Sequence, residues 1–329
     1  MMHALVLAAA IAGRGAPDTS LARLGAELRR AAAESGGTMG ASVLHLESGA
    51  RIAIRGAERF PMQSTYKVAI AMQLLHRAEL GQLSLDSSVR ILASDLRLGR
   101  SPLADSMPHG GGTRTVRQLV ELMVAESDNT ASDLVMKLAG GPAAVTARLR
   151  ALGVSGVRVD RQEGDLALDF FGVRHAPPER EWTRARLDSL ATAVPAAERR
   201  RSLERYLADP RDTATPDGEV ALLRSLWSGA ALDAAQTGWL LAVMTRSRGG
   251  ERRLQAGVPP ATPVAHKTGT SGVTGGVHAC VNDAGIITLP GSRGHVVVAV
   301  FVKRSTRAQP QIERAIADVA RAVYEHWMR

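Results

Sequence analysis

The chain has 329 residues, of which 45% are hydrophobic and 22% charged, and this composition is ordinary for a globular protein. This length suits one large domain or two lobes that share a core. The net charge of +9 would fit nucleic-acid binding, but the arginines are spread along the chain and aromatic residues make up only 3%, so no nucleic-acid partner is predicted.

The N-terminus carries a short apolar stretch, Ala4 to Ile11, followed by small residues and then polar ones from Pro17. A core of this length is typical of a signal peptide, which we predict over residues 1–18, with a periplasmic or secreted mature protein. A frayed helical tail is the alternative, because no Lys or Arg precedes the apolar stretch. No apolar run approaches the ~20 residues of a membrane helix, so no stable membrane anchor is expected.

Strand-like patterns occur at both ends of the chain, and helical patterns fill the middle. After a helical segment at 21–33, two alternating runs at 41–46 and 51–55 predict a hairpin, and a helix is predicted from Ser64 to Leu80. Helical segments separated by Gly- and Pro-bearing loops continue to about residue 253. Strands are then predicted at 264–270, 277–281, 285–289 and 295–302, before a final helix at 311–326.

This order predicts an α/β protein, α+β by chain order, in which one antiparallel sheet combines both chain ends and is flanked by the terminal helices. We expect a single catalytic domain over 19–329 with two lobes. The sheet lobe would comprise about 19–62 and 255–329, and the all-helical lobe about 63–254. A cleft between such lobes is the expected place for an active site.

The first candidate motif is Ser64-Thr65-Tyr66-Lys67, at the start of a predicted helix. Residues three apart share a helix face, so the Lys67 amine can lie beside the Ser64 hydroxyl. Serine needs a base to become a nucleophile, and a lysine can lose its proton whereas an arginine cannot. Lys occurs only four times in this arginine-rich chain, which favours a proton-exchanging role. The alternative is a helix capped by Ser64 with a solvated Lys67.

Two further motifs follow along the chain. Ser127-Asp128-Asn129 comes after a helical segment, where a helix-to-loop turn would explain it without any chemistry. Lys267-Thr268-Gly269-Thr270 lies on the first returning strand, where the glycine permits a close approach to the backbone. Its ammonium and hydroxyl groups suit a carboxylate ligand, although a lysine that protects an edge strand is the alternative.

Taken in this order, the three motifs resemble those of the class A serine β-lactamases. The resemblance covers roughly Leu21 to the C-terminus. It implies that Ser64 is the acylated nucleophile, Lys67 its proton partner and Ser127 the relay to the departing lactam nitrogen. It also implies that Asn129 holds the substrate's side-chain amide and that Lys267, Thr268 and Thr270 engage its carboxylate. The backbone N–H groups of Ser64 and Thr270 would form the oxyanion hole.

The resemblance also implies a second base, Glu163, which would position and deprotonate the water that removes the acyl group. Glu163 and Lys67 both stay candidates for the base of acylation. The alternative for Glu163 is a solvated acidic loop, because three aspartates lie within six residues of it.

Some positions depart from the commonest family pattern. Ala167 stands where many members carry an Asn that helps to hold the deacylating water, so deacylation is slow or another group holds the water. His266 precedes Lys267 where Asp is frequent, as in the extended-spectrum branch. Arg253 matches an alternative position for a carboxylate-binding arginine, and a surface arginine is the competing interpretation.

The stretch from Glu163 to Lys267 is longer than the family usually has, by about 30 residues, and a loop region tolerates such an insertion. We assign the excess to 184–212, with Ala196 to Ala208 as an added arginine-rich helix. The two alternatives are that this segment covers the cleft or that it lies on the surface away from it.

The expected function is β-lactam hydrolysis through an acyl-enzyme, with a small-molecule substrate, a monomeric protein, no cofactor and no metal, since no His shows ligand spacing. The first alternative is a slow-turnover penicillin-binding peptidase or a β-lactam-sensing acyl acceptor. A non-enzymatic basic binding protein for acidic polymers is more remote, because it rests on charge alone.

Overall fold

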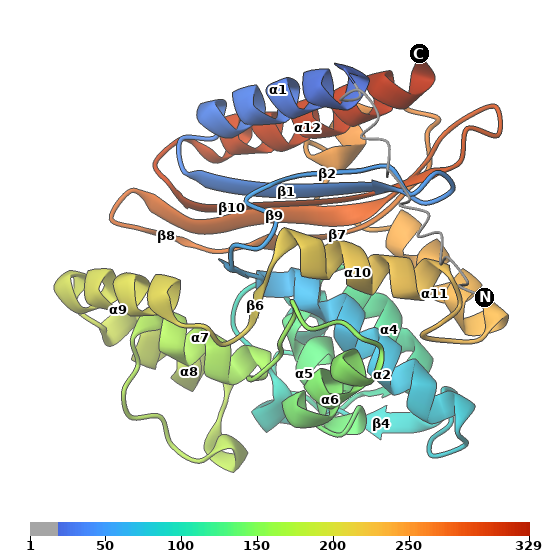
Figure 1. Cartoon of the computed structure of the whole chain (residues 1–329). Coiled ribbons are helices and arrows are strands. Elements are labelled where there is room, and N and C mark those ends of the chain that lie inside the picture. Colours follow the sequence, from blue (N-terminus) through green and yellow to red (C-terminus); the bar gives the residue numbers. More distant parts are fainter. Residues whose placement is uncertain (1–18) are drawn as a thin grey trace, which may run out of the picture.

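The computed structural model describes residues 19–329 and has a mixed α/β architecture, in which one antiparallel sheet lies between helices (Figure 1). The predicted fold class is therefore confirmed. The predicted signal peptide, residues 1–18, lies outside the described residues.

The main sheet has the strand order β2-β1-β10-β9-β7, with β8 paired to β9. All of its pairs are antiparallel, and β1 from the start of the chain pairs with β10 from its end, with Thr38 opposite Lys303. The strands are β1 (Thr38–His45), β2 (Arg51–Ile54), β7 (Val264–Thr270), β8 (Val273–Thr274), β9 (Val277–Thr288) and β10 (His295–Ser305).

One predicted boundary is wrong: the two strands expected at 277–281 and 285–289 form the single strand β9. The sequence Asn282-Asp283-Ala284-Gly285 suggests a turn, but both polar side chains are fully buried and hydrogen-bonded to other elements. Gly285 is needed because a Cβ there would lie 2.5 Å from the Cβ of His266 on β7.

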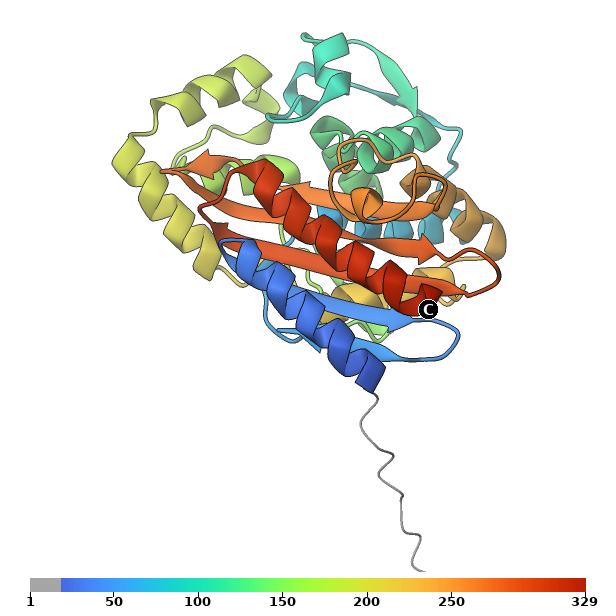
Figure 2. The same ribbon diagram turned by 90° about the horizontal axis from the view of Figure 1, so that it is seen from above.

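The apolar run of β10 is buried on both faces, as expected for a central strand. Val298 and Val300 belong to the core beneath the terminal helices, whereas Val297 and Phe301 belong to the core of the helical layer on the other side. The terminal helices α1 (Thr19–Glu34) and α12 (Gln309–Met328) run side by side across the first of these faces (Figure 2).

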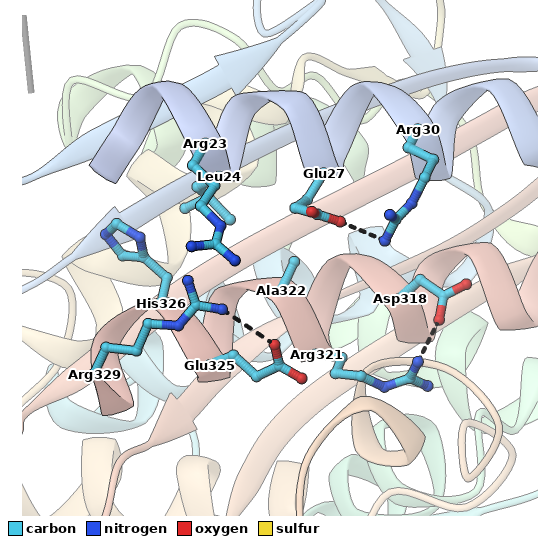
Figure 3. A pocket seen from close by; sticks show the side chains of 10 residues that line it. All are labelled: Arg23, Leu24, Glu27, Arg30, Asp318, Arg321, Ala322, Glu325, His326 and Arg329. Atoms are coloured by element: carbon cyan, nitrogen blue, oxygen red, sulfur yellow. Dashed lines mark ion pairs between the residues drawn. The ribbon is translucent and has the colours of Figure 1, made fainter. Parts of the chain in front are cut away.

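A charged groove separates α1 from α12 on the outer surface (Figure 3). Arg30 pairs with Glu27 on α1, and Arg321 pairs with Asp318 on α12 at 2.9 Å. None of the motif residues lines this groove, so it is separate from the predicted chemistry.

The other face of the sheet packs on a helical layer that surrounds α2 (Lys67–Glu79). Residues 67–72 of α2 are all buried, as expected for a helix enclosed by others. The neighbouring helices are α4 (Val116–Ala125), α5 (Asn129–Leu138), α6 (Pro142–Ala151), α10 (Pro216–Trp227) and α11 (Ala234–Thr245). Short elements are β3 (Phe60–Pro61), β4 (Ser88–Arg90), α3 (Pro102–Ser106), β5 (Thr113–Thr115) and β6 (Thr213–Ala214), with 3₁₀ helices η1 (Gln63–Tyr66), η2 (Ala93–Asp95), η3 (Glu179–Glu181) and η4 (Leu254–Gly257).

The long segment after residue 160 forms α7 (Glu163–Phe171), α8 (Arg184–Ala193) and α9 (Ala196–Ala208) on one side of the molecule (Figure 1). The predicted helix at Ala196–Ala208 is confirmed. Leu203 and Tyr206 of α9 pack with Leu166 and Phe170 of α7 and with Ala279 of β9 in a small core of their own. The segment that we predict as an insertion is therefore packed against α7 and β9.

Glu219 on α10 gives the fold a specific pH dependence. Its side chain is 1% exposed, its Oε2 has no hydrogen-bond partner among the described residues, and burial raises its pKa from 4.5 to about 8. The unfolded chain releases this proton near pH 4.5 while the folded protein keeps it, so the contribution of this group to stability falls as pH rises from about 4.5 to 8.

We expect the substitution Glu219→Gln to remove this decrease in stability with rising pH, because glutamine does not titrate. The free energy of unfolding of the variant minus that of wild type should increase by about 3 kcal/mol between pH 5 and pH 8. Urea unfolding at several pH values measures this difference, with the half-exposed Glu121→Gln as the matched control. Parallel curves for wild type and Glu219→Gln would contradict the assignment.

Candidate active site

A cleft of about 360 Å³ lies where β7 faces η1, α5 and α7, and residues of all three motifs meet there. The two motif lysines, Lys67 and Lys267, are buried and reach its polar groups through the bonds described below. The predicted residues that line the cleft are Ser64, Ser127, Asn129, Glu163, Arg253, Thr268 and Thr270.

Ser64 lies on the turn η1, directly before α2. Asn282 of β9 fixes the chain that enters this turn, since its Nδ2 donates to the carbonyl oxygens of Pro61 at 2.8 Å and Met62 at 3.0 Å. Its Oδ1 in turn accepts from the backbone N–H of Val302 at 3.2 Å. Sequence reasoning missed this role, although Asn282 is one of only two asparagines in the chain.

Gly269 allows β7 to lie directly against the same turn. A Cβ at this position would lie 2.3 Å from the carbonyl oxygen of Met62 and 3.3 Å from the backbone nitrogen of Ser64. The first distance is far inside van der Waals contact and involves backbone, so a larger residue would push the strand away from Ser64.

Lys67 is fully buried, which excludes the interpretation of a solvated lysine. Its Nζ donates to the carbonyl oxygen of Ser127 at 2.8 Å and to Oδ1 of Asn129 at 2.7 Å. The same nitrogen lies 3.2 Å from Oε1 of Glu163. One ammonium group thus joins the second motif to the predicted second base.

Ser127 is held by both motif lysines. While its carbonyl oxygen accepts from Lys67, its Oγ accepts from Nζ of Lys267 at 2.9 Å. Its φ of +57° is unusual for a non-glycine residue, and Ser127 lies on the short connection between α4 and α5. Burial, and then the nearby Lys67 ammonium, hold the pKa of Lys267 well below its ordinary value of 10.5.

The other two residues of the second motif have different partners. Asp128 is a structural residue, since it caps α5 by accepting from the backbone N–H of Ala131 at 2.8 Å. Asn129 donates from Nδ2 to the carbonyl oxygen of Leu98 at 2.9 Å and accepts from Lys67. Its Oδ1 has a second lone pair and its Nδ2 a second N–H, so the expected contact of Asn129 with a substrate amide requires neither bond to open.

Glu163 is the first residue of α7 and is 6% exposed, which excludes a solvated acidic loop. The carboxylate of Asp133 on α5 fixes this helix start, accepting from the backbone N–H groups of Glu163 at 2.6 Å and Gly164 at 3.0 Å. Asp133 also pairs with Nε of Arg97 at 2.5 Å, and the same guanidinium pairs with Glu179. No pattern in the sequence indicated this support.

Arg161 links the two ends of the chain segment that contains α7, α8 and α9. Its Nε lies 2.6 Å from Oδ2 of Asp212, and Oδ1 of Asp212 accepts from the backbone N–H groups of Asp160 and Arg161. Its Nη1 also pairs with Asp169 of α7 at 2.6 Å. The two ends of the segment 161–212 are thus held together.

Arg253 is 1% exposed, so the interpretation of a surface arginine is wrong. Its Nη2 donates to Oγ1 of Thr270 at 2.7 Å and pairs with Glu313 of α12 at 3.2 Å. Its Nη1 donates to the carbonyl oxygen of Asn282 at 2.7 Å. This guanidinium fixes the Thr270 hydroxyl and brings positive charge to the end of the cleft that the third motif forms.

His266 and Ala167, the two residues that differ from the commonest family pattern, have different surroundings. His266 is buried, and its Nδ1 lies 2.9 Å from Oδ1 of Asp283, so it joins β7 to β9 and does not line the cleft. Ala167 lines the cleft one turn beyond Glu163, where its methyl group offers no hydrogen bond to a water.

Among residues 19–329, no three His, Cys, Asp or Glu side chains are grouped so that they could hold a metal ion. Over the same residues, no helix combines the length and the apolar character that crossing a membrane requires. The groups that meet at the cleft are hydroxyls, ammonium groups, an amide, a guanidinium and a carboxylate.

The candidate nucleophile Ser64 and the carboxylate of Glu163 line one cleft beside two buried lysines, an arrangement suited to acyl transfer, and comparison with known proteins identifies the family. The model of the Beta-lactamase enzyme family matches residues 23–327. The extended-spectrum β-lactamase PER-1 of Pseudomonas aeruginosa is 32% identical over 88% of this chain and 82% of its own length. The carbapenem-hydrolyzing β-lactamase KPC of Klebsiella oxytoca is 30% identical over 94% of this chain and 92% of its own.

Solved structures agree with these relatives. A β-lactamase from Chitinophaga pinensis superimposes with a TM-score of 0.77 at 28% identity, covering 92% of this chain and 98% of its own. An ancestral class A β-lactamase gives a TM-score of 0.74 at 34% identity, covering 92% and 99%. The chain belongs to the β-lactamase enzyme family, and within it to the class A serine enzymes.

Proposed function

We propose that this chain hydrolyses β-lactams through an acyl-enzyme on Ser64, with Glu163 activating the water that releases the product. The observation that carries the proposal is the continuous network around the cleft. Lys67 contacts both Ser127 and Glu163, and Lys267 contacts the Ser127 hydroxyl.

In acylation, Ser64 Oγ attacks the lactam carbonyl carbon, and its proton passes either to Glu163 or to Lys67 after the Lys67 ammonium has given a proton to Glu163. The 3.2 Å contact between these two groups supports proton exchange between them. The backbone N–H groups of Ser64 and Thr270 stabilise the oxyanion. As the C–N bond breaks, Ser127 gives a proton to the lactam nitrogen and regains one through the network of Lys67 and Lys267.

The substrate carboxylate binds at the third motif, where Lys267, Thr268 and Thr270 supply positive charge and hydroxyl donors. Arg253 supports this end through its bond to the Thr270 hydroxyl. At the opposite end, Asn129 holds the side-chain amide. Beyond it the cleft wall is apolar, which favours an acyl side chain with apolar groups, and it is formed by Leu98, Leu166, Phe170 and Phe171.

Deacylation separates this proposal from its alternative. Glu163 takes a proton from a water, and the resulting hydroxide attacks the Ser64 ester carbonyl, so that Ser64 leaves as an alcohol and takes a proton back. Ala167 favours the alternative of a slow-turnover acyl acceptor, since it offers no second hydrogen bond to that water.

The test is to mix the purified protein with excess chromogenic cephalosporin and to follow product over time. We expect sustained turnover together with a mass adduct on Ser64. A stoichiometric burst that then stops would replace hydrolysis by the acyl-acceptor function. Absence of both turnover and adduct would contradict an acyl-enzyme and leave a non-enzymatic basic binding protein.

We also propose that the chain is exported to the periplasm or the medium, that residues 1–18 are removed and that the mature protein is a monomer. The apolar stretch from Ala4 to Ile11 supports export. Intact mass of the protein recovered from each cell fraction, and light scattering of the purified protein, measure these points. A full-length cytoplasmic product would contradict export.

A further inference from the structure

The inserted helix α9 reaches the turn that carries the nucleophile. Nε2 of Gln63, the residue before Ser64, donates to the hydroxyl oxygen of Tyr206 at 2.6 Å. Tyr206 is 5% exposed and does not line the cleft, and neither does any other residue of α8 or α9. The insertion thus supports the cleft from behind and does not cover it.

Gln63 needs such support because of its backbone. Its φ is +49°, in the left-handed region that residues other than glycine rarely adopt. Strained conformations of this kind persist where surrounding contacts hold them. The φ and ψ of Gln63 set the direction of the next peptide N–H, which belongs to Ser64, so a change at Gln63 would turn a proposed oxyanion donor.

Helix α9, which carries Tyr206, is itself held in place from several sides. Its ring meets that of Phe170 edge-on at a centroid distance of 5.2 Å. On the same helix, Glu204 forms two hydrogen bonds with Arg304 of β10 at 2.9 and 2.6 Å. Ser202 Oγ also donates to the carbonyl oxygen of Asp169 on α7 at 2.7 Å. Helix α9 is therefore tied to both the sheet and α7.

We propose that Tyr206 is a positioning residue for acylation, which acts through Gln63 to hold the Ser64 N–H toward the oxyanion. The proposal rests on the proposed acyl-enzyme function. In this proposal helix α9 affects the rate of acylation and not substrate binding, because the Tyr206 hydroxyl acts on the reacting atoms through Gln63 and does not line the cleft.

Tyr206→Phe removes the hydroxyl and keeps the ring in the small core. We expect the maximal acylation rate, measured by rapid mixing with a chromogenic cephalosporin, to fall about five- to tenfold. The half-saturating substrate concentration and the thermal unfolding midpoint should stay close to wild type. A structural role alone would lower the midpoint and leave the maximal rate unchanged, since the folded fraction at 25 °C would still be near one.

A double-mutant cycle tests the route through Gln63. Gln63→Met removes the amide and keeps a side chain of similar length, so Tyr206→Phe in that background should cost less than twofold more. Tyr324→Phe on α12, which does not line the cleft, is the matched control. A Tyr206→Phe rate within twofold of wild type, or effects that multiply in the double variant, would overturn the proposal. A wild-type protein that forms no Ser64 adduct would instead overturn the acyl-enzyme function.

Discussion

Glu163→Gln is expected to lower steady-state β-lactam hydrolysis by about a thousandfold and to make the Ser64 acyl adduct accumulate. A positioned general base contributes roughly 10²–10⁴-fold, and glutamine removes the base while keeping the shape of the side chain. The amide oxygen can still accept from Lys67, so the network around Ser127 should persist. Intact-protein mass spectrometry after seconds of mixing measures the adduct, and chromogenic substrate measures turnover.

The matched control is Asp165→Asn, which makes the same chemical change at an exposed position of α7. Its turnover should stay within about twofold of wild type. If Glu163→Gln keeps the wild-type steady rate, Glu163 is not the deacylating base. If its adduct fails to form at all, Glu163 is needed for acylation as well, which would assign the first proton transfer to it.

Lys67→Arg is expected to slow formation of the Ser64 adduct by at least about a hundredfold. Arginine keeps the positive charge and can donate to the Ser127 carbonyl oxygen and to Asn129, but it cannot release a proton. It is also larger, in a site with no exposed surface. The rate of adduct formation, followed by mass spectrometry over minutes, gives the effect.

Lys303→Arg serves as the control, since this lysine lies at the end of β10, where it pairs with Glu58 at 2.9 Å. Acylation by Lys67→Arg within fivefold of wild type would mean that Lys67 contributes charge alone. The base of acylation would then be Glu163. The two variants together therefore decide between the two candidates that the sequence leaves open.

The fold was largely predictable because its strands carry clear patterns, and the exception has a physical cause. Alternating residues at 41–46 and the apolar run of β10 identify a sheet built from both ends. The break expected inside β9 is absent because Asn282 and Asp283 find partners on elements remote in sequence. Local composition cannot distinguish a polar pair in a turn from a polar pair buried within a strand.

The cleft residues were predictable from three motifs and their resemblance to a known family, but the groups that hold them were not. Asp133 and Arg97 fix the start of α7 through contacts between segments far apart in the chain. Only Asn282 gave a signal, as a rare residue type. The helix at Ala196–Ala208 was predictable from its composition, whereas the contact of Tyr206 with Gln63 depends on how that helix packs.

The pairing of β1 with β10 has a consequence for how the protein acquires its structure. The partners Thr38 and Lys303 are far apart in the sequence, so the middle of the sheet forms only after the chain has been synthesised through β10. Contacts of such high sequence separation slow folding, because the entropy of closing a long loop is lost before the contacts contribute any stabilising free energy. A nascent chain that ends before His295 lacks the central strand β10, and the turn that carries Ser64 then lacks the Val302 N–H that binds Asn282.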